Sequence, residues 1–137
     1  MANGAYSAAI GYNNSATGVD ALAVGNSNTV DGNQSSALGA DNYVDGDSNF
    51  AAGRDNFIGT TGISDSYNND VVGSHNTIND SDGNRVTGHG NFIDPSNYNL
   101  VSGSYNALVN SNFNSLSGNA NVLYQSNANA VSGTANL

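Results

Sequence analysis

The chain has 137 residues and a formal net charge of −9, which argues against nucleic acid or an anionic membrane surface as a partner. Its acids are all Asp, its bases are Arg54 and Arg85, and it lacks Lys, Glu, Cys and Trp, so disulfides and thiolate metal sites are excluded. Abundant Asn, Asp, Ser and Gly favour turns over helix. No apolar run is long enough to insert into a bilayer.

A repeat runs through the whole chain and is seen by aligning the sequence on one glycine. The spacings are 14, 14, 14, 20 and then 15 four times, between Gly11, Gly25, Gly39, Gly53, Gly73, Gly88, Gly103, Gly118 and Gly133. Three residues after each glycine stands Asn: Asn14, Asn28, Asn42, Asn56, Asn76, Asn91, Asn106, Asn121 and Asn136. Disorder, the alternative for so polar a chain, does not produce this register.

Aliphatic residues keep the same register at two further positions. One stands two residues before each glycine and another two residues after each Asn, as Val71 and Ile78 do; in the first repeat Ala16 takes the second place. Each half-repeat therefore predicts a short strand with an inward aliphatic side chain and a turn at Asn, with Gly in left-handed backbone. The prediction is an all-β parallel β-roll, a solenoid of about nine coils of 14–15 residues in which stacked Asn side chains form a turn ladder.

The first coils also carry a family resemblance. The segments Ser7-Ala8-Ala9-Ile10-Gly11, Ala21-Leu22-Ala23-Val24-Gly25 and Ser35-Ser36-Ala37-Leu38-Gly39 resemble the head repeat of the YadA-like trimeric autotransporter adhesins. From Asn84 onward the residue before each glycine is polar (Thr87, Ser102, Ser117, Ser132), which looks like a divergent form of the same repeat.

This resemblance implies a left-handed β-roll over residues 1–137 as a single head domain. It also implies a homotrimer exposed at the bacterial cell surface, with virulence-related attachment to host cells, extracellular matrix or other bacteria. The stalk and the outer-membrane anchor are expected outside these residues. The residues themselves point to an assembly surface, because Ile10, Val24 and Leu38 alternate with inward Ala and should form an outward apolar column. We expect this column to be the trimer contact.

Interruptions of the repeat are the candidate ligand-binding regions. The 20-residue step contains a six-residue insertion near residues 60–67, and the segment 94–98 holds the single Pro. Tyr98 and Phe113 both stand five residues before a glycine, so they should stack in adjacent coils as binding anchors. A purely structural aromatic ladder is the alternative. The predicted ligand-binding residues are Thr60, Thr61, Ile63, Asp65, Tyr67, Tyr98, Tyr105 and Phe113.

Catalytic chemistry has little support in the sequence. His75 and His89 are one coil apart without a third ligand column, and the oxygen-rich segments 45–49 and 80–84 lack a complete calcium loop. Asp70 and Arg85 both precede their glycines by three residues and should form an ion pair. We therefore expect no enzyme, no cofactor and no metal site.

Three other functions compete with an adhesin head. A structural spacer needs only the regular repeat, and a phage-fibre or polysaccharide-active solenoid would need paired carboxylates in a groove. An ice-binding solenoid would need an unbroken threonine column, which Thr17, Thr29, Thr77 and Thr87 do not form. The excess of Asp favours a ligand with basic patches.

Overall fold

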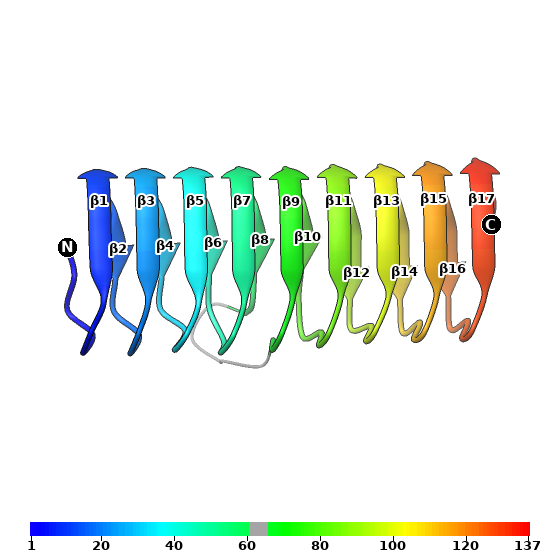
Figure 1. The fold of residues 1–137 in the computed structure, drawn as a ribbon. Coiled ribbons are helices and arrows are strands. Elements are labelled where there is room, and N and C mark those ends of the chain that lie inside the picture. The colour runs from blue at the N-terminus through cyan, green and yellow to red at the C-terminus, as the bar shows by residue number, and fades with distance from the viewer. Residues whose placement is uncertain (61–65) are drawn as a thin grey trace.

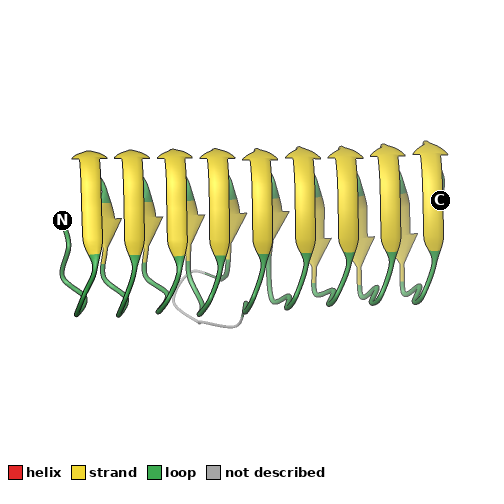
Figure 2. Ribbon diagram, in the orientation of Figure 1, coloured by secondary structure: helices red, strands yellow, loops and turns green. Residues whose placement is uncertain are grey.

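A computed structural model describes residues 1–60 and 66–137, and it is a parallel β-solenoid (Figure 1). Each coil contributes one strand to each of two sheets that lie face to face. Figure 2 shows strands and turns throughout the described residues and no helix, so no helix there could span a membrane. The all-β prediction is confirmed.

The two sheets differ in strand length. The long-strand sheet consists of β1 (Ala8–Tyr12), β3 (Leu22–Asn26), β5 (Ser36–Ala40), β7 (Phe50–Arg54), β9 (Asp70–Ser74), β11 (Arg85–His89), β13 (Leu100–Ser104), β15 (Ser115–Asn119) and β17 (Ala130–Thr134). The short-strand sheet consists of β2 (Ser15–Ala16), β4 (Thr29–Val30), β6 (Tyr43–Val44), β8 (Phe57–Ile58), β10 (Thr77–Ile78), β12 (Phe92–Asp94), β14 (Ala107–Val109) and β16 (Val122–Tyr124).

The chain winds with a left-handed sense. In Figure 1 it rises along a long strand in front, returns along a short strand behind, and advances by one coil towards the C-terminus. The turns from long to short strands form the first edge, at the top of Figure 1, and the turns back to the next long strand form the second edge, at the bottom. Within the described residues, nine long and eight short strands make eight complete coils, and β17 opens a ninth.

The core is one layer of side chains between the sheets. Long strands contribute the residue two before each glycine, small in the early coils (Ala23, Ala37, Ala51) and larger later (Val71, Val86, Val101, Leu116). Short strands contribute the second predicted column, from Ala16 and Val30 to Ile93 and Leu108. These residues are at most 1% exposed, as the aliphatic spacing predicts. Such a thin core contains few apolar atoms per coil, so other interactions must hold the coils in register.

The predicted glycine column is confirmed, and its glycines have positive φ as expected, but they lie within strands and have a second role. The nine glycines pair in register along the long-strand sheet, and Gly25 has a φ of 122° inside β3. A Cβ added there would lie 2.0 Å from the carbonyl oxygen of Gly39 in the next coil. Glycine is therefore required because neighbouring coils approach closely at this column.

The left-handed residues of the turns are mostly not glycine. At the first edge, the residue before each ladder Asn takes a positive φ, such as 57° at Asp41 and 57° at His75. At the second edge the residue five before each glycine does so, including Tyr98 and Phe113. Asn and Asp tolerate positive φ better than most residue types. However, Ser, His, Tyr, Phe, Gln and Ala also take positive φ in these turns. The nine column glycines do take positive φ, as predicted, but they lie within the long strands, and most of the left-handed turn residues are of other types.

The segment 94–98 is not an interruption of the fold. Asp94 pairs with Val109 in the short-strand sheet, and the Ser96 main-chain N–H donates to Ser81 Oγ at 2.9 Å. The Tyr98 main-chain N–H donates to the Asp82 carbonyl at 2.8 Å. Residues 94–98 thus follow the same course as the matching residues of the other 15-residue coils, with Pro95 accepted at an exposed turn position.

Candidate interaction surfaces

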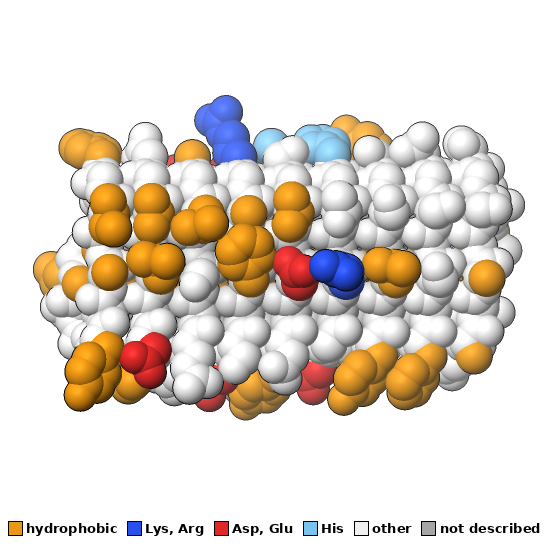
Figure 3. Space-filling model, viewed as in Figure 1, with side chains coloured by type: hydrophobic (Ala, Val, Ile, Leu, Met, Phe, Trp, Pro, Cys, Tyr) orange, Lys and Arg blue, Asp and Glu red, His pale blue; other side chains and the backbone are white. Residues whose placement is uncertain are grey.

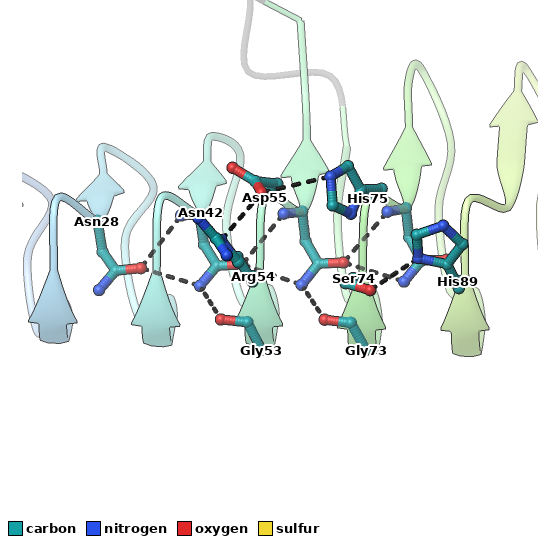
Figure 4. Close-up of polar contacts among 11 residues, drawn as sticks. Asn28, Asn42, Gly53, Arg54, Asp55, Gly73, Ser74, His75 and His89 are labelled. Carbon is teal, nitrogen blue, oxygen red and sulfur yellow. Dashed lines mark hydrogen bonds and ion pairs between the residues drawn. The ribbon is translucent and has the colours of Figure 1, made fainter.

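The first edge is held by a ladder of buried asparagines. Asn28 shows the pattern: its Nδ2 donates to Asn14 Oδ1 at 3.0 Å and to the Gly39 carbonyl at 2.8 Å, while its own Oδ1 accepts from Asn42. Each amide therefore bonds to the coil before it and the coil after it (Figure 4). The ladder residues of the complete coils are Asn14, Asn28, Asn42, Asn56, Asn76, Asn91, Asn106 and Asn121, all at most 5% exposed.

The second edge has its own ladders. Asn49, Asn69, Asn84, Asn99, Asn114 and Asn129 form a second asparagine ladder, which continues across the 20-residue step through a 3.1 Å bond from Asn69 Nδ2 to Asn49 Oδ1. A serine column, which the sequence reading missed, runs beside it from Ser66 through Ser81, Ser96 and Ser111 to Ser126. Among the described side chains, no buried polar atom lacks a hydrogen-bond partner.

The outer face of the long-strand sheet carries the predicted trimer-contact residues. Ile10, Val24 and Leu38 pair in register and continue into Ala52 and Val72. We call these five residues the apolar strip. Beyond it the same column continues as Thr87, Ser102, Ser117 and Ser132. Figure 3, viewed onto this face, shows hydrophobic side chains over the early coils and polar ones over the late coils in this column.

A parallel column on this face holds the predicted ion pair. Arg85 lies beside Asp70 in the next strand, and its Nε is 3.4 Å from Asp70 Oδ2. Both side chains are largely exposed, at 71% and 43%, so the pair contributes little to stability.

The predicted ligand-binding residues do not form one site. Tyr98 and Phe113 stack at the second edge, with ring centroids 5.3 Å apart and an interplanar angle of 9°, as predicted. Tyr105 lies on the first edge, across the roll from them. Thr60 and Tyr67 flank the insertion, and Thr60 Oγ1 donates to Asp80 at 3.4 Å. Thr61, Ile63 and Asp65 lie outside the described residues.

Both histidines lie in a polar cluster on the first edge (Figure 4). Asp55 Oδ2 lies 3.3 Å from Arg54 Nε and 3.4 Å from His75 Nε2. His89 shares a 2.8 Å hydrogen bond with Ser74 and packs edge-on against His75 and Tyr105. In the described part of the chain, no three His or Asp side chains converge as a metal ion would require.

The short-strand sheet carries an aromatic pair that the sequence reading missed. Tyr43 and Phe57 stack with centroids 5.0 Å apart and an interplanar angle of 10°. They are adjacent in the outward column and separate Thr29 from Thr77, so this column offers no threonine array of the kind that ice binding requires. The sequence does contain a signal for this pair, because Tyr43 and Phe57 each directly follow a ladder Asn.

The surroundings of Tyr43 change its acidity. Burial raises the pKa of Tyr43 above the ordinary 10.0, and the negative charges of Asp45 and Asp31 and a hydrogen bond with Asp45 raise it further. The aromatic pair therefore lies next to negative charge.

We predict that the pKa of Tyr43 lies above the ordinary 10.0. It is measured from the tyrosinate absorbance that the Tyr43→Phe substitution removes from the pH titration of the protein. The pKa of Tyr43 is higher in the folded state than in the unfolded state. Its ionisation therefore leaves the free energy of unfolding unchanged below about pH 10, and the free energy of unfolding falls as the pH rises from there through the folded-state pKa. Asp45→Asn, which keeps the oxygen that accepts from the Gly46 N–H, should lower the Tyr43 pKa. A Tyr43 pKa at or below the ordinary 10.0 would contradict this prediction.

Comparison with known proteins bears on the N-terminal coils. The family model for the YadA head domain repeat matches the chain twice, over residues 2–27 and 16–42. No curated protein matches the chain in sequence. The matched residues include Gly11, Gly25 and Gly39 with the strands around them, which are the coils on which the predicted resemblance rests. Residues 2–42 therefore match the YadA head domain repeat.

Proposed function

We propose that this chain is the head of a trimeric autotransporter adhesin, displayed on a bacterial surface and attaching to host cells, extracellular matrix or other bacteria. The observation that carries the proposal is the YadA head repeat over residues 2–42, continued by coils of the same register through the described chain. The head acts by binding, without catalysis.

Assembly as a trimer is supported by the apolar strip. Ile10 is 58% exposed and Val72 42% exposed, and the strip follows the solenoid axis over five coils. An apolar surface of this kind is stabilised when another surface covers it. Three parallel rolls around a common axis would bury one strip each against the others. Over the late coils, serines in the same column would leave a wetter contact.

We expect the ligand contacts of such a trimer on the surfaces that face away from its axis. These are the two edges, the short-strand sheet and the region of the insertion. Three symmetric copies raise a weak affinity through avidity. A spacer function is the competing proposal, supported by the regular polar columns of the late coils.

The trimer is tested by the double substitution Val24→Asp and Leu38→Asp. Two buried carboxylates per chain should prevent assembly, so light scattering should give the mass of a trimer for the parent and of a monomer for the variant. The matched control, Tyr12→Asp with Asn26→Asp, adds the same charge at the first edge of the first two coils and should remain trimeric. A double variant that is still trimeric and equally heat-stable would exclude the strip as the contact.

Adhesion is tested with the folded trimer on host cells and on immobilised matrix proteins. Deletion of residues 60–65, and separately Tyr98→Ser with Phe113→Ser, should each reduce the bound fraction because they remove irregular or aromatic surface from the outer wall. Binding that survives both changes would move the contact elsewhere on the roll. A parent trimer that binds none of the surfaces would favour the spacer.

A further inference from the structure

The Tyr98–Phe113 pair forms a platform with one open side. Tyr98 lies over Gly83 in the preceding coil, where an added Cβ would be 2.6 Å from Tyr98 Cδ1. Phe113 stacks on the other side of Tyr98, and Ala128 follows it in the same turn column of the next coil. Since Ala128 is small, it does not cover the second face of Phe113. Phe113 is 65% exposed.

A column of oriented carboxamides runs beside this platform. Asn97 Oδ1 accepts from the Asp82 main-chain N–H at 2.6 Å, Asn112 Oδ1 from Asn97 at 2.6 Å, and Asn127 Oδ1 from Asn112 at 2.7 Å. These bonds fix each amide through its oxygen. The Nδ2 groups of all three have no partner among the described residues, so each offers two free N–H donors at the surface.

This arrangement has the two features that a sugar ring requires. The C–H face of a pyranose packs on an aromatic face, whose π-electrons attract weakly positive hydrogens. Its hydroxyl oxygens then need donors at the rim of the ring, held in fixed positions. Phe113 offers the aromatic face. The donors come from Asn112, which precedes Phe113 in the same coil, and from Asn127, which takes the equivalent position in the next coil.

We propose that the second edge at Phe113, Asn112 and Asn127 is a binding site for a neutral pyranose unit of a glycan. The sugar stacks on the open face of Phe113 above Ala128, and the Nδ2 groups of Asn112 and Asn127 donate to its hydroxyl oxygens. Tyr98 supports the Phe113 ring from behind. The proposal names a ligand class for the adhesin head and rests on that proposed function.

Charge selects neutral over acidic sugars. The chain has a net charge of −9, and the carboxylate of Asp82 occupies the carboxamide column two coils before Asn112. Arg54 and Arg85, the only Lys or Arg residues of the chain, lie in other columns, on the long strands β7 and β11. A sialylated or uronic-acid sugar would thus find no cation at this site.

The test is titration of the ¹⁵N-labelled trimer with cellotetraose, galactotetraose and N-acetylchitotetraose, with sialyllactose as the acidic counterpart. At least one neutral oligosaccharide should bind saturably and shift the side-chain amide resonances of Asn112 and Asn127. Phe113→Ser should weaken this binding by about tenfold or more. Ser48 stands at the same turn position in an early coil, so the substitution is compatible with the fold.

Two further variants separate the contacts. Asn112→Asp keeps the oxygen that accepts from Asn97 but removes the donors, as Asp82 already does in this column, and it should weaken binding as well. Tyr6→Ser is the matched control, since Tyr6 is an exposed aromatic at the same turn position in the first coil and is not stacked on another ring there. It should leave the affinity unchanged.

The proposal is overturned if no neutral oligosaccharide binds, if binding survives Phe113→Ser or Asn112→Asp, or if sialyllactose binds as tightly as the neutral sugars. These results are separable from the fate of the adhesin proposal. A trimer that adheres to cells but binds none of the sugars refutes the glycan site alone. A trimer that binds a sugar through Phe113 but adheres to no cell or matrix surface refutes the adhesin function alone.

Discussion

The amide of asparagine, stacked once per coil, is the interaction on which the rest of this structure depends. A coil of 14 or 15 residues places only one inward aliphatic side chain per strand, too little apolar surface to offset the entropy of ordering the coil by itself. The buried amide supplies what the core lacks. Its oxygen accepts from the following coil and its nitrogen donates to the preceding one, so neighbouring coils are joined at fixed spacing on both edges.

The ladders leave the outward columns free to vary. Since register is set by buried Asn and by the close approach at the glycines, a residue that points away from the core need only fit a strand or a turn. The positive-φ turn columns illustrate this, because they accept His75 and Tyr105 at the first edge and Tyr98 and Phe113 at the second. The apolar strip, the polar cluster that contains both histidines and the two aromatic pairs all lie on such outward positions. Substitutions there can change what the surface binds without loss of the fold.

Periodicity was sufficient to predict the inside of the roll. The glycine register and the inward aliphatic columns follow from counting, because parallel stacking places equivalent residues side by side. The same counting predicted the Asp70–Arg85 pair on the outer face. The turns were less predictable, since positive φ at Asp41 or Phe113 depends on a local backbone path that residue type does not specify. Pro95 was misread for the same reason. The carboxamide column of Asn97, Asn112 and Asn127 was missed because its spacing is visible but its hydrogen bonds are not.

The most direct test of the ladder is the substitution Asn42→Ala, measured as the change in the free energy of unfolding by urea. The change removes the bonds of Asn42 to Asn28 Oδ1 at 2.9 Å and to the Gly53 carbonyl at 3.0 Å, and leaves the buried Asn56 N–H without its acceptor. We predict a loss of about 3 kcal/mol. Asn26→Ala, at an exposed position, should change stability by no more than about 0.5 kcal/mol. Equal effects of the two substitutions would contradict the account.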